Sequence, residues 1–300
     1  MQGIGLTTGG YSGVQKCRIK EYGNIKSNLR MKKFLLLASI ISILIVCCFL
    51  KTKQIIDTKF IDKDLLILKC KDDMSFIFDT GANETILYSD TIPSSFFHIS
   101  DIKAKDVFSE EYSMKRYYSF KTNIGGIENC FHSVVLLPSN VQIGDTNGIW
   151  GTDIIDRFCW WIDFDKHQIC SNYTPNEDAD FVLAYYKRNN LYYTDIAIGT
   201  IKLKDMLIDT GYTRSDFTLP QKELALMGLP IIGTDTCYNM INITQILNRY
   251  EMNESYINEK LFKNITFTDL SSKRLIGLPF FKRFSAIYLN TKKKQIECWI

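Results

Sequence analysis

After residue 55 the chain shows repeated short runs of β-branched and aromatic residues, bounded by glycine, proline or polar residues. The clearest runs are residues 65–69, 131–137, 192–198 and 262–267. Runs of this length and composition are typical of β-strands. Gly125-Gly126 and Gly199-Thr200 predict hairpin turns between strands. Helical spacing favours only short helices, over residues 154–158, 221–227 and 244–250. We therefore expect an all-β fold.

One earlier segment departs from this pattern. Residues 34–50 form an apolar run of 17 residues without a charge or a proline, and lysines flank it on both sides. As a helix it would span about 25 Å, slightly less than a ~30 Å hydrocarbon layer. This length fits either a transmembrane anchor or the core of a signal peptide. No small-x-small cleavage site follows, which favours an uncleaved anchor. Leu44–Cys47 resembles a lipoprotein box only loosely, because Val46 occupies the place of a small residue.

The residues before this run have no periodic apolar face, and we expect residues 1–33 to be a disordered N-terminal extension. A natural start at Met31 is the alternative, since the chain would then open with a basic segment followed directly by the apolar run. Arg30, Lys32 and Lys33 favour an amino end inside the cytoplasm. We therefore expect the rest of the chain to be membrane-anchored or exported, in the cell envelope or periplasm if the protein is bacterial.

The part after the apolar run contains an internal repeat. Phe-Ile-Phe-Asp-Thr-Gly at residues 76–81 is followed 130 residues later by Met-Leu-Ile-Asp-Thr-Gly at residues 206–211. A second element, apolar-Gly followed by an apolar pair and Arg-Phe, occurs at residues 150–158 and again at residues 276–284. Two elements in the same order at nearly the same spacing indicate two homologous lobes. We place these lobes at residues 60–178 and 181–300.

Composition and charge exclude several classes of protein. The 300 residues are 46% hydrophobic and 23% charged, which excludes a disordered chain. A net charge of +3 does not indicate a basic surface that would bind nucleic acid. Six of the nine cysteines follow the apolar run, and buried free thiols explain them as well as disulfide bonds do. The three histidines are scattered and no Cys-x-x-Cys pair occurs, so we expect no metal site and no cofactor.

The repeated Asp-Thr-Gly motif suggests the chemistry. Its residues are Asp79, Thr80 and Gly81 in the first copy, and Asp209, Thr210 and Gly211 in the second. A single copy would be explained by a strand ending in an Asp/Gly turn. With two copies, each apolar strand can deliver its carboxylate to a buried cleft floor, each glycine permits a tight loop, and each threonine can hydrogen-bond into the opposite loop. Two carboxyl groups in contact share one proton, so one can act as base on a water while the other acts as acid.

On these motifs the sequence resembles the aspartic protease superfamily, and in particular bacterial retropepsin-like proteins, with two lobes fused as in pepsin. The resemblance covers about residues 60–300. It implies two homologous acid-protease (retropepsin-like) β-barrel lobes around an interlobe cleft, with Asp79 and Asp209 as the catalytic dyad. Thr80 and Thr210 would join the two loops. Gly151 and Gly277 would lie in the apolar-Gly strands behind the site. Both lobes lie in one chain, so a monomer is expected.

The sequence departs from the pepsin pattern at two places. Ala82 follows the first motif, whereas pepsin-like members have a residue with a hydroxyl group at this place. In this respect the sequence is similar to the retroviral enzymes. Tyr212 is bulky at the equivalent place, so either its ring packs aside or the second loop is altered. Family spacing places the substrate-covering flap within residues 111–119. Tyr117 or Tyr118 would then project over the cleft, although ordinary packing of strand aromatics explains them better.

Two functions follow. The first is an aspartic endopeptidase that hydrolyses an extended polypeptide with an activated water. The second is an inactive, protease-like module of the cell envelope that binds peptides, which Tyr212 favours. Two complete motifs favour the enzyme, because an idle site would not need two buried carboxylates.

Overall fold

The computed structural model describes residues 33–36, 56–62, 65–70, 73–105, 111–171, 173–238, 244–270 and 273–300. Residues 1–54 and 55–300 form separate units, and residues 33–36 are the described part of the first. The rest of the predicted apolar segment 34–50, and all of the expected extension 1–33 except Lys33, lie outside the described residues. Within the described ranges, no helix is long and apolar enough to cross a membrane.

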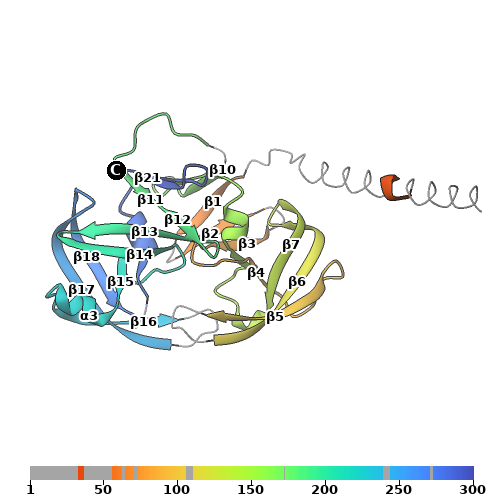
Figure 1. The fold of residues 1–300 in the computed structure, drawn as a ribbon, viewed down its shortest axis with the longest axis horizontal. Helices are drawn as coiled ribbons and strands as arrows, with labels where there is room; N and C mark the ends of the chain where they lie inside the picture. The colour runs from red at the N-terminus through yellow and green to blue at the C-terminus, as the bar shows by residue number, and fades with distance from the viewer. Residues whose placement is uncertain are drawn as a thin grey trace, which may run out of the picture. The chain divides into compact units, whose positions relative to one another are not determined.

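Residues 55–300 form one compact unit built mainly of β-strands, which confirms the all-β expectation (Figure 1). Within this unit we call residues 57–171 the first lobe and residues 181–299 the second lobe. The elements of the first lobe are β1 (Asp57–Asp62), β2 (Leu66–Lys69), β3 (Ser75–Phe78), β4 (Ile86–Tyr88), β5 (Phe97–Lys105), β6 (Glu111–Ile124), β7 (Ile127–Leu137), the 3-10 helix η2 (Ser139–Val141), β8 (Gly148–Trp150), α2 (Thr152–Ile155), β9 (Trp160–Asp163) and β10 (Gln168–Ser171). Those of the second lobe are β11 (Phe181–Ala184), β12 (Tyr186–Arg188), β13 (Leu191–Ile198), β14 (Ile201–Asp209), β15 (Phe217–Leu219), α3 (Gln221–Leu226), β16 (Ile231–Tyr238), β17 (Thr244–Ile257), β18 (Lys260–Asp269), β19 (Leu275–Gly277), α4 (Leu278–Phe281), β20 (Ala286–Asn290) and β21 (Gln295–Trp299).

The two lobes repeat one local strand topology. In the first lobe β3 pairs parallel with β8, β8 pairs antiparallel with β4, and β4 pairs parallel with β7. In the second lobe β14, β19, β15 and β18 are paired in the same order and the same directions. The repeated sequence motif is therefore a repeated fold motif, in which the strand that ends at each motif aspartate lies beside an apolar-Gly strand.

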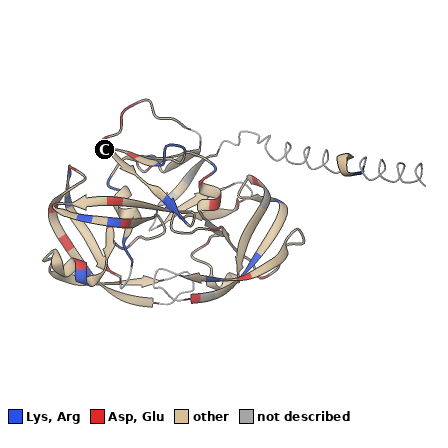
Figure 2. Ribbon diagram, in the orientation of Figure 1, with Lys and Arg blue, Asp and Glu red and all other residues tan. Residues whose placement is uncertain are grey.

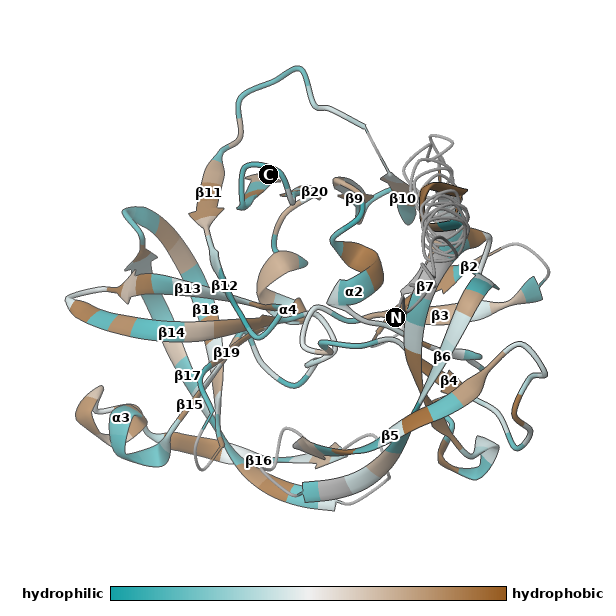
Figure 3. Ribbon diagram, turned by 45° about the vertical axis from the view of Figure 1, so that its right-hand side comes forward, coloured by the Kyte–Doolittle hydropathy of each residue, from teal (hydrophilic) through white to brown (hydrophobic). Residues whose placement is uncertain are grey.

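A sheet shared by the two lobes joins them. β9 of the first lobe pairs antiparallel with β20 of the second, and the sheet continues through β10 and β1 on one side and β21 and β11 on the other (Figure 3). Trp160 on β9 is fully buried, and its ring meets Phe78 on β3 edge to face at 5.3 Å. The strand that leads to Asp79 therefore packs against the strand that pairs with the second lobe.

Strand residues follow the alternation expected of a sheet with one buried face. Hydrophilic and hydrophobic positions alternate along the first part of β14, and every second residue of β13 is buried (Figure 3). Gly125 and Gly126 form the turn between β6 and β7 with φ of +61° and +87°, which favours glycine. The hairpin turn predicted at Gly125-Gly126 is thus confirmed. The helix predicted over residues 221–227 is also present, as α3.

The helix expected over residues 244–250 is wrong, because these residues begin the long strand β17. β17 pairs with β16 on one side and with β18 on the other. β-branched residues such as Thr244 and Ile246 suit a strand, and pairing on both sides outweighs a local helical spacing. Of the cysteines, Cys70, Cys159, Cys237 and Cys298 are free thiols, which agrees with the thiol alternative for these four.

Gly151 directly follows β8 and Gly277 ends β19, and in both places the loop after the motif aspartate passes close to the glycine. A Cβ on Gly151 would lie 2.6 Å from the Glu84 carbonyl oxygen. A Cβ on Gly277 would lie 2.5 Å from the Ser215 carbonyl oxygen and 2.9 Å from that of Tyr212. These atoms belong to backbone, so they cannot turn away as a side chain would. Any larger residue must push the loop away from the strand.

We predict that Gly277→Ala destabilises the protein by about 2–3 kcal/mol, because the new methyl group overlaps backbone. Gly233→Ala is the matched control, since a Cβ there would meet nothing within 4 Å. Urea unfolding of the full chain measures both variants. Equal unfolding midpoints for the two variants would contradict the role given to Gly277.

Candidate active site

The fold brings the two Asp-Thr-Gly motifs together at the interface of the lobes. Asp79 directly follows β3, and Asp209 is the last residue of β14. In each motif the glycine N–H donates to the aspartate Oδ1, at 2.7 Å for Gly81 and 3.0 Å for Gly211. A Cβ on Gly81 would lie 2.4 Å from Cγ of Asp209, and one on Gly211 would lie 2.6 Å from Cγ of Asp79. Each carboxyl group therefore occupies the space beside the glycine of the opposite motif.

The two threonines join the loops through reciprocal hydrogen bonds. Thr80 Oγ1 donates to the Ile208 carbonyl at 2.8 Å, and Thr210 Oγ1 donates to the Phe78 carbonyl at 2.8 Å. Each Oγ1 also accepts from the other threonine's N–H, at 3.0 Å in both directions. Both side chains are buried. The separation of the carboxyl groups is thus set by four hydrogen bonds that cross between the lobes.

The carboxyl groups of Asp79 and Asp209 hydrogen-bond to each other, and this contact changes their acidity. Burial raises the pKa of both groups above its ordinary value. The pKa of Asp209 is raised further by the neighbouring Asp79 charge, whereas backbone N–H groups oppose the rise at both residues. Because two ionised carboxylates in contact repel each other, the pair retains one proton over a pH range in which isolated carboxylates are ionised.

The ring of Tyr212 packs aside and leaves the second loop like the first. The side chain is only 4% exposed, and its hydroxyl lies 2.6 Å from Thr268 Oγ1. The Tyr212 N–H donates to the Asp209 carbonyl, and the Ala82 N–H donates to the Asp79 carbonyl in the same way. Of the two alternatives raised by this residue, the structure shows the first.

Neither candidate flap tyrosine contacts the cleft. Tyr117 is 5% exposed and belongs to the hydrophobic core, and Tyr118 packs on Phe97 and Phe120. Ordinary packing of strand aromatics therefore explains both residues. The connection between β5 and β6, residues 106–110, lies outside the described residues.

The dyad lies in a cleft of about 950 Å³ that both lobes line. The first lobe contributes residues of β3, β4 and β8, and the second contributes residues of β12–β14, α3 and β16. This volume is at the upper end of the range of small-ligand pockets and suits a segment of an extended chain. In the part of the chain that the structure describes, no group of three or more His, Cys, Asp or Glu side chains could hold a metal ion.

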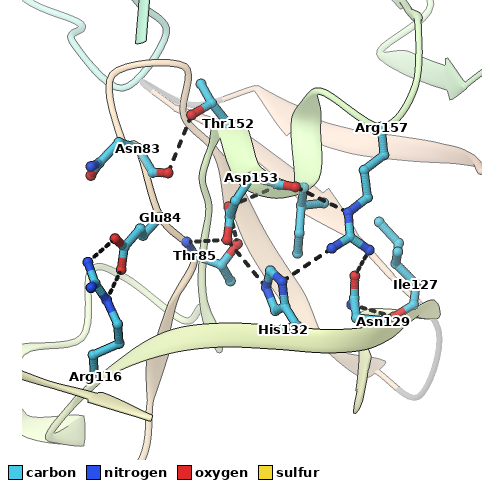
Figure 4. A network of polar contacts seen from close by, with 11 residues as sticks. Asn83, Glu84, Thr85, Arg116, Ile127, Asn129, His132, Thr152, Asp153 and Arg157 are labelled. Carbon is cyan, nitrogen blue, oxygen red and sulfur yellow. Dashed lines mark hydrogen bonds and ion pairs between the residues drawn. The ribbon is translucent and has the colours of Figure 1, made fainter. Parts of the chain in front are cut away.

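A polar network behind the first loop was not predicted from the sequence (Figure 4). Asp153 on α2 accepts from the Thr85 N–H at 3.0 Å and from Thr85 Oγ1 at 2.7 Å. Glu84, one residue earlier, forms an ion pair with Arg116 on β6. These contacts fix the loop that begins at Asp79 to α2 and to the outer strands. No spacing rule connects these residues, so no sequence pattern indicates that they meet.

A buried histidine extends this network. The Arg157 guanidinium lies 3.2 Å from His132 Nδ1 and also donates to Asn129. His132 Nε2 lies 3.3 Å from Asp153 Oδ2, but without the geometry of a hydrogen bond (Figure 4). Burial, and then the positive charge of Arg157, lower the pKa of His132 to about 4. The imidazole is therefore neutral in the folded protein near pH 7.

The second lobe fixes its loop differently. Asp216 accepts from Arg283 Nε at 2.7 Å and from Nη2 at 2.5 Å, and from the Thr266 N–H at 2.7 Å. Arg283 occupies the place in the repeat that Arg157 has in the first lobe. A direct arginine–carboxylate pair thus replaces the arginine–histidine–carboxylate chain.

Comparisons with known proteins show the fold. No protein-family model matches the sequence, and no curated protein matches it. The structure is similar to Basic 7S globulin from soybean, with a TM-score of 0.50 and 8% identity over 82% of this chain and 96% of that one. A retropepsin-like aspartic protease from Rickettsia conorii matches 40% of this chain and 89% of its own, at 23% identity and a TM-score of 0.29. The fold is aspartic-protease-like, and the identities show no more than the fold.

We predict that His132 makes stability depend on pH between about 6.5 and 4. In this range the unfolded chain binds a proton at His132 that the folded chain excludes, so stability falls as the pH falls from 6.5 to 4. The loss is at most ~3 kcal/mol. Urea unfolding at several pH values should show a shallower dependence for His132→Gln than for the unmodified chain.

His98→Gln is the control, because His98 is exposed. Its pH dependence should stay close to that of the unmodified chain. If His132→Gln also leaves the dependence unchanged, the imidazole is already hydrated or protonated in the folded state.

Proposed function

We propose that this chain is an aspartic endopeptidase with Asp79 and Asp209 as its catalytic dyad. The observation that supports this most directly is the contact between two carboxyl groups from opposite lobes at the floor of a shared cleft. The aspartic-protease-like fold agrees with it. The Thr80–Thr210 hydrogen bonds hold the pair in place before a substrate binds.

In the proposed reaction one carboxyl group is ionised and the other is protonated. The carboxylate takes a proton from a water held between the two groups, and the water oxygen attacks the carbonyl carbon of the peptide bond. The protonated carboxyl group donates to the carbonyl oxygen, so a neutral tetrahedral intermediate forms. Transfer of a proton to the amide nitrogen then lets the carbon–nitrogen bond break. This chemistry requires no covalent intermediate, metal ion or cofactor.

The substrate that fits is a polypeptide in extended conformation. The cleft crosses the boundary between the lobes, so a chain lying in it contacts both and passes over the dyad. The alternative is a peptide-binding module without catalysis, and Tyr212 was the residue that favoured it. That residue packs into the second lobe and leaves the Asp209 loop regular, so it gives no reason to prefer the alternative.

The proposed setting of the enzyme follows from the sequence. The apolar run 34–50 with its basic flanks supports a membrane-tethered or exported protein whose catalytic part lies outside the cytoplasm. Both aspartates belong to one chain, which supports a monomer as the active form. The net charge supports no role in nucleic-acid binding.

We predict that Asp79→Asn and Asp209→Asn each lower the rate of peptide cleavage at least ~10²-fold, because either change removes the shared proton or the base. The full chain is incubated with an unfolded protein between pH 3 and 7, and the products are followed by mass spectrometry. Asp90→Asn is the control, since its carboxylate is exposed and outside the cleft.

Cleavage that survives both dyad substitutions would show that another site is responsible. If the unmodified chain cleaves nothing at any of these pH values, the peptide-binding module becomes the better account.

A further inference from the structure

The two walls of the cleft differ in chemistry. The first-lobe wall is mainly apolar, and its apolar residues are Leu65, Ile77, Ala82, Ile86, Ile143 and Ile149. Apart from Asp79, none of the described residues that line the cleft from this lobe is charged. A substrate side chain directed to this wall therefore meets a surface that favours apolar groups.

The second-lobe wall holds the charges. Its basic residues are Arg188, Arg214, Lys222, Lys273 and Arg274, and its acidic residues besides Asp209 are Asp205 and Glu223. They come from β12, β14, α3 and the segments beside them, and residues of both signs are visible on α3 (Figure 2). When the dyad residue Asp209 is left out, this wall has three more positive than negative side chains.

The acidic residues of this wall already have partners. Glu223 accepts from Arg274 Nε at 2.9 Å and from Nη2 at 2.6 Å. Asp205 accepts from Arg188 Nη1 at 3.0 Å and from the Tyr186 hydroxyl at 2.5 Å. These pairs neutralise two of the basic residues, so the positive surplus rests on Arg214, Lys222 and Lys273.

Arg214 is the cation of the three that belongs to the catalytic loop, because it lies three residues after Gly211. Its side chain is 31% exposed and forms a long ion pair with Asp235, at 3.9 Å between Nη1 and Oδ1, which is too far for a hydrogen bond. Lys222 and Lys273 have no ion-pair partner among the described residues. The guanidinium of Arg214 therefore keeps donors for a ligand in the cleft.

The corresponding loop position of the first lobe has the opposite character. Glu84 lies five residues after Asp79, as Arg214 lies five residues after Asp209. Its carboxylate is bound by Arg116 and does not line the cleft. The positive surplus is thus confined to one side of the site, and it breaks the twofold symmetry of the lobes.

We propose that the cleft selects polypeptide segments that present apolar side chains to the first lobe and an acidic side chain to the second, where Arg214 binds the carboxylate. Successive side chains of an extended chain point in opposite directions, so neighbouring residues can satisfy both walls. Guanidinium groups pair well with carboxylates, and the lysines raise the local concentration of acidic segments. As a statement about cleavage this inference rests on the proposed function, whereas the binding preference does not require catalysis.

The test uses short apolar peptides that differ only in Glu, Gln or Lys at one position, scanned along the peptide. Cleavage by the full chain is measured at about pH 5.5, where peptide carboxylates are ionised. Binding of the same peptides to the full-length Asp79→Asn variant is measured by fluorescence anisotropy. At one or more positions we expect Glu to exceed Lys at least about threefold in both kcat/KM and affinity.

Arg214→Glu should reverse this preference, and Lys273→Glu should weaken it in a second, independently folded variant. Lys202→Glu makes the same charge change outside the cleft and should leave the preference unchanged. Cleavage that ignores peptide charge at every position would overturn the inference and leave the proposed function intact. Tighter binding of acidic peptides without cleavage would support the inference and contradict the proposed function.

Discussion

Two carboxyl groups in contact repel each other when both are ionised, and each loses hydration when a cleft closes around it. Asp79 and Asp209 are held in this unfavourable contact by the hydrogen bonds between Thr80 and Thr210. Those bonds join the ends of β3 and β14, which belong to different lobes. The shared sheet between β9 and β20 places the lobes so that the bonds can form. The site is therefore a property of both lobes together.

The elements around the dyad hold its loops from behind. Gly151 and Gly277 let each loop approach its apolar-Gly strand closely. A carboxylate in each lobe, the partly buried Asp153 in one and the buried Asp216 in the other, then binds threonine groups nearby. The lobes differ in what stabilises this carboxylate, since an arginine binds it directly only in the second lobe. The two motif loops therefore have the same geometry, although different polar contacts stabilise them.

The sequence was sufficient for the parts of the structure that repeat. The two Asp-Thr-Gly motifs and the two apolar-Gly elements predicted the repeat and the meeting of the aspartates, because each motif combines a strand with a residue of restricted geometry. The helix expected at residues 244–250 failed because pairing of β17 on both sides outweighed local spacing. The His132–Asp153 network and the charged cleft wall were not predictable. Their members lie far apart in sequence without periodicity and meet only through the packing of separate strands.

The central claim is that Asp79 and Asp209 share one proton across the interface of the lobes. NMR titration of the full chain with ¹³C-labelled aspartate carboxyl groups measures this directly, with the two signals assigned through the Asp79→Asn and Asp209→Asn variants. The account predicts two titration steps that both signals report, with the upper step above the ordinary aspartate pKa of about 4. Independent titration of both groups near the ordinary value would contradict it.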